Sequence, residues 1–157
     1  MGKTEKLEIK AGIKILKPSE EVFEAIVDPK KMSGYFISNS SGRMESGKTL
    51  IWQFPEFDMQ FPVRVEKVDP SVYIAYYWSD PEGYETKVEF TLKAVDNNST
   101  FVSITEKNRE NNAKGIEWLR RNTEGWANFL ACLKAFLEYG INLRKGAFDM
   151  SQLPQTN

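Results

Sequence analysis

The chain has 157 residues, of which 41% are hydrophobic and 27% charged, and 21 basic residues against 22 acidic ones leave a formal net charge of −1. This size and composition are ordinary for one globular domain with a hydrophobic core, and no run of like charge indicates a nucleic-acid or polybasic membrane surface. Because the sequence contains no histidine, it excludes histidine-based catalytic triads and histidine ligands for a metal or haem.

The first predicted element is a strand over residues 7–15, where apolar and polar residues alternate as they do in a strand that buries one face. A short helix follows, with Ser19 as its expected N-cap and two glutamates in its first turn, at the positive end of the helix dipole. We expect this helix to end at Asp28, because a residue that precedes proline is disfavoured in the helical region. Pro29 is the expected start of a second short helix.

Six further strands are expected after the second helix. Their β-branched and aromatic residues cluster in the ranges 35–37, 49–54, 61–66, 72–78, 87–92 and 101–105. Turn-forming residues separate them, including Asn-Ser-Ser-Gly at 39–42, a hairpin connection at 55–58 and Asp-Pro-Glu-Gly at 80–83. Short strands joined by brief turns favour a sheet of antiparallel neighbours.

One long amphipathic helix follows the last strand. From Gly125 to Leu143 apolar residues recur at steps of three and four, and residues 115–124 extend the same helix toward its N-terminus. The apolar stripe must lie on the sheet, because neither element can bury its apolar face alone. We therefore assign residues 1–143 to a single domain and residues 144–157 to a polar C-terminal tail.

The long helix carries Cys132, the one cysteine of the sequence, so no disulfide can form within a monomer. A lone thiol fits a reducing compartment, no apolar stretch approaches membrane-spanning length, and the first ten residues contain no apolar signal region. We expect a cytoplasmic protein without membrane insertion. With no histidine to activate it, Cys132 is interpreted as a packed or half-exposed thiol rather than a nucleophile.

The element order is strand, two short helices, six strands and one long helix, which is that of the helix-grip fold. This is an α+β architecture in which a curved antiparallel sheet of about seven strands wraps around the C-terminal helix. Residues 13–36 resemble the opening motif of the SRPBCC (START-like, Bet v 1-like) superfamily, residues 61–78 its central hairpin, and residues 85–92 and 99–106 its last two strands. Residues 125–137 resemble the closing helix of one branch, related to the C-terminal domain of activators of the heat-shock-protein ATPase.

The resemblance implies a cavity between the sheet and the long helix. We hypothesise that the chain binds a small hydrophobic ligand there, lipid-like or aromatic, without a cofactor, a metal or catalytic residues. Two alternatives stay open, since one fold hosts many functions. The first is a chaperone-linked interaction module, as a monomer or homodimer. The second, less favoured, is a cyclase- or hydrolase-type enzyme that uses cavity Tyr, Glu or Arg groups as acid and base.

Aromatic residues are abundant, with ten Phe, six Tyr and four Trp, and they can line a cavity or simply fill a core. The residues predicted to line the cavity are Tyr35, Trp52, Phe54, Phe61, Val63, Tyr76, Trp78, Val88, Phe90, Trp118, Trp126, Phe129, Leu130 and Leu133. Glu106, Arg120 and Arg121 are further candidates at the cavity mouth. Charged residues on the opposite strand faces are interpreted as solvated cross-strand neighbours.

Overall fold

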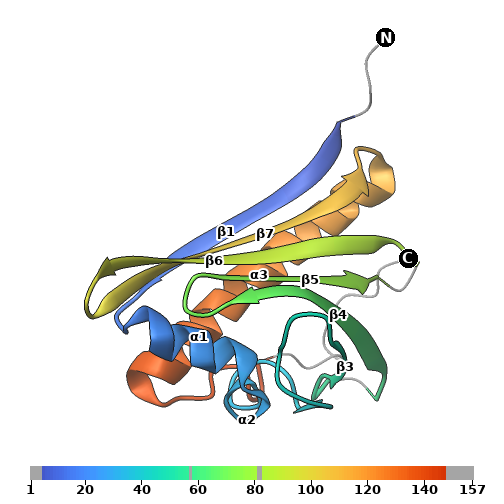
Figure 1. The fold of residues 1–157 in the computed structure, drawn as a ribbon. Coiled ribbons are helices and arrows are strands. Elements are labelled where there is room, and N and C mark those ends of the chain that lie inside the picture. The colour runs from blue at the N-terminus through green and yellow to red at the C-terminus, as the bar shows by residue number, and fades with distance from the viewer. Residues whose placement is uncertain (1–4, 57, 81–82, 148–157) are drawn as a thin grey trace.

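The computed structural model describes residues 5–56, 58–80 and 83–147, and in these residues one antiparallel sheet packs against one long helix (Figure 1). The strands are β1 (Lys6–Ile15), β2 (Asn39–Ser40), β3 (Thr49–Gln53), β4 (Gln60–Asp69), β5 (Tyr73–Ser79), β6 (Glu85–Asp96) and β7 (Ser99–Glu110). The helices are α1 (Ser19–Val27), α2 (Pro29–Met32) and α3 (Ala113–Tyr139). The predicted α+β helix-grip architecture is therefore confirmed.

The sheet has the strand order β1-β7-β6-β5-β4-β3-β2, so β2 to β7 form a meander and only β1 is out of sequence order. β1 pairs with β7 along its whole length, which joins the first and last strands at one edge. In the view of Figure 1, α3 passes diagonally behind the sheet, while α1 and α2 lie below it, near the C-terminal end of α3. Helix α1 contacts α3, β6 and β7 there.

Helix α1 begins at Ser19, and the prediction that Ser19 caps it is wrong. Pro18 occupies the N-cap position, and the Ser19 hydroxyl instead hydrogen-bonds that of Thr100 on β7, at 3.0 Å. Asp28 does end the helix as predicted, and its carboxylate accepts a 2.9 Å hydrogen bond from the backbone N–H of Lys30, which caps α2. Helix α1 therefore begins without a side-chain cap, whereas α2 has one.

The second strand lies later in the chain than predicted. Residues 35–37 form an irregular segment after α2, and β2 occupies residues 39 and 40, where a turn was expected. Tyr35 is 1% exposed and its hydroxyl donates a 2.8 Å hydrogen bond to the carbonyl oxygen of Ala25. The three apolar residues are buried without forming a strand. A run of three residues is too short for periodicity to distinguish a strand from a buried irregular segment.

Helix α3 is held at both ends by its caps. The side chain of Asn112 accepts a 2.8 Å hydrogen bond from the backbone N–H of Gly115 at the N-terminus. Gly140 follows the helix with a φ of 65°, a left-handed conformation that ends helices. The helix therefore stops short of Leu143, its predicted end, and the chain after Gly140 turns back toward the sheet.

An extra residue in β7 changes which side chains reach the inner face of the sheet. Leu7 pairs with Arg109 and Glu8 with Lys107, so Asn108 bulges out of the ladder, with a φ of 95° that asparagine tolerates better than most residues. The bulge shifts Arg109 onto the same face as Glu106, and the two residues are 4% and 0% exposed. Two ionisable side chains thereby reach the interior beside the start of α3.

The two faces of the sheet differ sharply in character. The inner face and α3 share one apolar core rich in aromatic rings. The outer face carries ion pairs such as Lys87–Glu66 and Lys107–Glu89, both at 3.1 Å, in agreement with their interpretation as solvated neighbours. Among the described residues no helix is both long and apolar enough to cross a membrane.

Candidate ligand site

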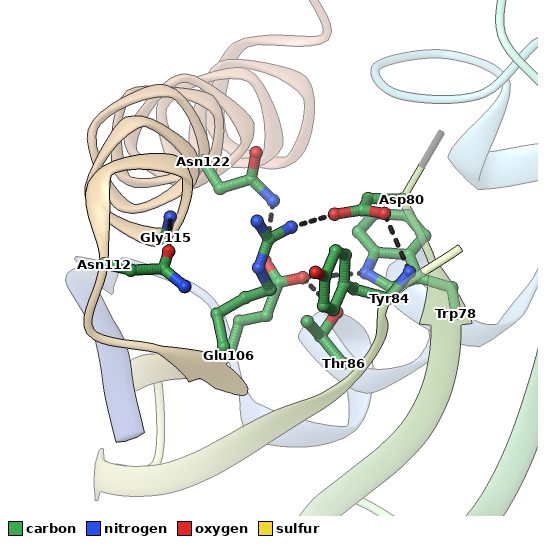
Figure 2. Close-up of polar contacts among 9 residues, drawn as sticks. Trp78, Asp80, Tyr84, Thr86, Glu106, Asn112, Gly115 and Asn122 are labelled. Atoms are coloured by element: carbon green, nitrogen blue, oxygen red, sulfur yellow. Dashed lines mark hydrogen bonds and ion pairs between the residues drawn. The ribbon is translucent and has the colours of Figure 1, made fainter. Parts of the chain in front are cut away.

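A buried carboxylate, that of Glu106 on β7, lies where α3 crosses the sheet. Its Oε2 atom accepts hydrogen bonds from Trp78 Nε1 at 2.9 Å and Thr86 Oγ1 at 2.6 Å. Its Oε1 atom accepts hydrogen bonds from Asn122 Nδ2 at 3.0 Å and Trp126 Nε1 at 2.8 Å. Figure 2 shows the carboxylate between Thr86 on the sheet and Asn122 on the helix. One side chain therefore joins strands β5, β6 and β7 to α3.

The Glu106 carboxylate is suited to positioning its neighbours. A buried carboxylate is costly unless it is fully hydrogen-bonded, and four donors divided between two oxygens meet that requirement. The sequence predicted Glu106 at a cavity mouth, whereas the structure places it fully inside. Arg120 and Arg121, the other mouth candidates, instead pair with Glu117 on an exposed face of α3.

A second buried charge cluster lies next to the first, around Arg109. Its guanidinium pairs with Asp80 and lies 4.2 Å from the ring centre of Tyr84 and 5.9 Å from that of Trp118. Figure 2 shows Asp80 and Tyr84 beside the Glu106 carboxylate. Trp118 is 5% exposed and packs inward. Asp80, interpreted from sequence as a turn residue, also accepts the backbone N–H of Tyr84 at 2.9 Å, so it serves both roles.

An aromatic pocket opens beside these clusters, between α3 and the strands that follow β2. Its volume is about 170 Å³, and it is lined by Phe36, Phe54, Trp78, Asn122, Gly125, Trp126 and Arg144. A cavity of about 150 Å³ lined by apolar groups is large enough to bind benzene, so this pocket suits one aromatic ring. Trp78 and Trp126, which form its floor, are the two indoles held by Glu106.

A larger and more polar pocket adjoins the aromatic one, with a volume of about 420 Å³. Phe36 and Arg144 line both pockets, which places the two side by side. The polar pocket lies between the loop after α2, the β3–β4 connection and the segment after α3, with Ser38, Glu56 and Lys145 among its lining residues. Its volume is in the range of small-molecule sites.

Two donors in the core behind the aromatic pocket, the Trp52 indole N–H and the Tyr76 hydroxyl, have no hydrogen-bond partner among the described residues. Trp52 is 1% exposed and Tyr76 0%, and their ring centres are 5.4 Å apart. Both rings pack against Trp78, with ring centres at 6.1 Å and 5.4 Å, so one aromatic layer separates them from the pocket. Burial, reinforced by the Glu106 charge, raises the pKa of the Tyr76 hydroxyl, which stays a neutral donor.

The fourteen residues predicted to line a cavity divide into three groups. Phe54, Trp78 and Trp126 line the aromatic pocket, and Tyr35 lines the polar one. Phe61 packs on Phe54, with ring centres 5.6 Å apart. The others belong to the packed core: Trp52, Val63, Tyr76, Val88, Phe90, Trp118, Phe129, Leu130 and Leu133. Their contact with a ligand stays a prediction.

Four residues of the aromatic pocket, Phe36, Asn122, Gly125 and Arg144, were not selected from the sequence. Asn122 lies four residues before Trp126, a spacing that places both side chains on one helical face, so this residue could have been found. Phe36 was interpreted as a strand residue, and Arg144 was assigned to the C-terminal tail. Residues 148–157 of that tail lie outside the described residues, as do Phe57 of the predicted hairpin connection and Pro81 and Glu82 of the predicted turn.

A seven-stranded antiparallel sheet packed on a long C-terminal helix, with pockets between them, defines a START-like helix-grip protein of the SRPBCC (Bet v 1-like) superfamily. Within this class, residues 17–138 match the family model of the Activator of Hsp90 ATPase homolog 1-like proteins, and the chain belongs to that family. The resemblance stated from the sequence is therefore confirmed. A comparison with curated proteins gave no match.

Solved structures show the same similarity. Protein SSP2350 from Staphylococcus saprophyticus is 32% identical with a TM-score of 0.77, over 88% of this chain and 96% of that one. The Aha1 dimer from Colwellia psychrerythraea is 25% identical with a TM-score of 0.72, over 85% of this chain and 98% of that one. DynU16, a putative protein in the dynemicin biosynthetic locus, has a TM-score of 0.75 over 85% of this chain and 48% of that one. At 24% identity this last match shows the fold alone.

Proposed function

We propose that the chain binds a small, mostly apolar ligand, aromatic or lipid-like, in the space between the sheet and α3. The observation that carries the proposal is the pair of buried donors on Trp52 and Tyr76, unpartnered among the described residues, one aromatic layer behind the pocket. An unsatisfied buried donor costs about 1–3 kcal/mol, so a core that served packing alone would favour apolar groups there. A ligand carbonyl or ether oxygen between the two donors would restore both hydrogen bonds.

Entry of such a ligand requires one aromatic ring to move. Phe36 lines the aromatic pocket and packs against Trp52, with ring centres 5.8 Å apart, and its ring centre lies 5.1 Å from that of Phe54 and 4.7 Å from that of Phe129. Rotation of the apolar Phe36 side chain breaks no hydrogen bond, and Phe36 lies in the irregular segment after α2. In this proposal the ligand ring replaces the Phe36 ring against Trp52.

The proposal is tested by titrating the purified chain with 2-acetylnaphthalene, an aromatic ketone, while tryptophan emission is followed, and by native mass spectrometry of the chain as isolated. We expect saturable quenching, because Trp52, Trp78 and Trp126 surround the site. The variant Y76F keeps the ring and removes one donor, so affinity should fall about fivefold, the value of one net hydrogen bond. A co-purified small molecule would support the proposal equally.

The matched control is Y73F, because the Tyr73 hydroxyl bonds Glu89 rather than facing the core. Its affinity for the ketone should equal that of the wild type. Absence of any saturable quenching, together with a native mass that equals that of the bare chain, would leave only a packed core. If wild type and Y76F bind the ketone with equal affinity, the Tyr76 hydroxyl does not contact the ligand.

A protein-interaction module is the second candidate, and it is favoured by the apolar surface at the end of α3. Tyr139 is 70% exposed, Ile141 52% and Leu143 49%. The family is named for activators of the Hsp90 ATPase, and the Colwellia psychrerythraea relative is a dimer. We propose that this surface contacts a chaperone of the Hsp90 class or a second copy of the chain.

The interaction proposal is tested with a purified Hsp90-class ATPase and with light scattering of the chain alone. Stimulated ATP turnover or a dimeric mass, lost in the double variant I141S/L143S, would support it. A monomeric mass and an unchanged turnover would exclude both partners. The double variant should leave the ketone titration unchanged, since neither residue lines the aromatic pocket.

The geometry supports catalysis less well than binding. A cyclase- or hydrolase-type reaction needs a group that can exchange a proton with the substrate. The Glu106 oxygens are each engaged by two donors, and burial raises the pKa of Tyr76, which makes its hydroxyl a poor acid. These groups suit the orientation of a ligand better than proton transfer.

A further inference from the structure

Arg144 lies at the junction of the aromatic and the polar pocket, and it already holds a carboxylate. Its Nη2 and Nε atoms lie 2.6 Å and 3.1 Å from the two carboxylate oxygens of Glu56. The two side chains are 15% and 10% exposed. The guanidinium carbon lies 5.6 Å from the ring centres of both Phe36 and Phe54, which line the aromatic pocket.

The Arg144–Glu56 ion pair is more buried than the exposed ion pair of the same two-point geometry. The two-point pair of Arg43 with Glu24 has similar distances, 2.8 Å and 2.7 Å, but its side chains are 40% exposed and line neither pocket. A largely desolvated ion pair contributes little more to stability than apolar side chains would in its place. Stability alone therefore gives no reason for a guanidinium at the mouth of an aromatic pocket.

The chemistry of the junction matches one class of ligand. The guanidinium fork holds a carboxylate in two-point geometry, and a ligand carboxylate can take the same position as that of Glu56. Lys145, Asn142 and Ser38 line the polar pocket beside Arg144 and can donate further hydrogen bonds. Arg144 and Glu56 both lie in connections outside strands and helices, so their pair can open while those elements stay intact.

We propose that Arg144 is the anchor for the carboxylate of a small amphipathic acid. This proposal rests on the proposed function, because the apolar body of that acid would occupy the aromatic pocket. The acid would lie with its carboxylate turned outward to Arg144, whereas the carbonyl of a neutral ketone would turn inward to Trp52 and Tyr76. In the structure Glu56 takes the place of the ligand carboxylate, and the ligand binds by displacing it. The chain thereby selects acids over neutral molecules of the same shape, and Glu56 sets how tightly they bind.

Two pairs of probes with equal shape test the anchor in the full chain: 2-naphthoic acid with 2-acetylnaphthalene, and octanoic acid with 2-nonanone. Each acid differs from its ketone in one hydroxyl group replaced by methyl. Whether the pocket binds the naphthyl or the alkyl group, we expect the acid to bind about tenfold more tightly than its ketone at neutral pH, because a carboxylate forms a charge-assisted pair with Arg144. In R144Q that preference, measured as the ratio of acid to ketone affinity within the same variant, should vanish.

Three further variants complete the test. R43Q removes the exposed counterpart of the same ion-pair geometry and should keep the full acid preference. R144K retains the charge without the fork and should keep part of it. E56Q removes the competing carboxylate, so acid affinity should rise about threefold while ketone affinity stays the same. The E56Q arm is decisive even if R144Q fails to fold.

The outcomes separate the two proposals. Equal affinity for acid and ketone in the wild type, or an acid preference that survives in R144Q, overturns the anchor and leaves the proposed apolar binding function intact. An unchanged acid affinity in E56Q likewise overturns displacement. Failure of all four probes to bind overturns the proposed function as well. Preference for the aromatic or the aliphatic acid identifies the body of the ligand.

Discussion

The space between the sheet and α3 contains two polar regions that differ in whether their buried groups are satisfied. Beside the start of α3, Glu106 accepts four hydrogen bonds and Arg109 pairs with Asp80. Further along the sheet, the donors of Trp52 and Tyr76 are both buried and have no hydrogen-bond partner among the described residues. The two regions adjoin at Trp78, whose indole bonds Glu106 and whose ring packs on both unpaired side chains.

The difference separates a part of the core that hydrogen bonds hold rigidly from the part where we propose that a ligand binds. A satisfied buried network holds its members in one arrangement, because every movement breaks a hydrogen bond. A region with unpaired buried donors is stabilised by a molecule that supplies the missing hydrogen-bond acceptor. The Glu106 network therefore holds the floor of the pocket, formed by Trp78 and Trp126, while the neighbouring region is the part of the core where we propose that a ligand binds.

The largest expected effect concerns the satisfied region, through E106Q. The amide keeps the size of the carboxylate but turns an NH₂ group toward two of the four donors, so we expect a loss of about 3 kcal/mol in the free energy of unfolding. Urea denaturation measures it. E110Q, an exposed glutamate on the same strand, is the control and should stay within about 0.5 kcal/mol. A similarly small effect of E106Q would contradict the role assigned to the network.

The second effect concerns Arg109, which R109M replaces by an apolar side chain of similar length. Loss of the cation beside the largely buried Asp80 should lower the free energy of unfolding by about 2 kcal/mol. R64M is a matched control, because Arg64 also covers a tyrosine ring, at 4.4 Å from Tyr77, and pairs with a glutamate, but on the exposed outer face. R64M should change the free energy of unfolding by less than about 0.5 kcal/mol. Equal changes in R64M and R109M would contradict the distinction between the exposed and the buried arginine.

The third effect compares two fully buried tyrosines, Tyr35 and Tyr76. The Tyr35 hydroxyl donates to the carbonyl oxygen of Ala25, whereas that of Tyr76 is unpaired among the described residues. We expect Y35F to destabilise the fold by about 1 kcal/mol and Y76F to leave it unchanged or more stable. Thermal or urea unfolding of both variants measures the contrast. A loss in Y76F equal to that in Y35F would mean that the Tyr76 hydroxyl is satisfied in solution, for example by a buried water.

The smallest effect concerns Gly125, where a Cβ atom would meet nothing within 4 Å. G125A should raise the free energy of unfolding by up to about 1 kcal/mol, since alanine favours helix interiors over glycine. G125L places a larger side chain at the aromatic pocket and should weaken ketone binding without a loss of stability. Unfolding curves and the fluorescence titration check the pair. Undiminished binding in G125L would place the ligand elsewhere.

Much of the fold could be predicted because its signals are local. The alternation over residues 7–15 falls within β1, and the apolar steps around Trp126 fall within α3. The strand predicted at residues 35–37 was wrong because three apolar residues carry no periodicity that distinguishes a strand from a buried irregular segment. Helix α3 ends at Tyr139 because Gly140 adopts a left-handed conformation, which an apolar pattern does not report.

The candidate site was less predictable, because its geometry depends on contacts between distant residues. Trp78 and Trp126 were selected as aromatic residues, yet their shared carboxylate on Glu106 follows from the packing of α3 across the sheet. Arg144 carried no signal as a tail residue, and its pairing with Glu56 joins residues 88 positions apart.

By itself, the sequence determined the fold class, the family and the apolar faces of strands and helix, because periodicity and side-chain type act within a few residues. Tertiary structure alone decided which polar groups became buried and which of them found partners. The bulge at Asn108 brings Arg109 inside, the crossing of α3 supplies Glu106 with two of its four donors, and the turn after Gly140 carries Arg144 back to the pocket. Hydrogen bonding is directional and short-ranged, so these partnerships exist only once distant segments are in contact.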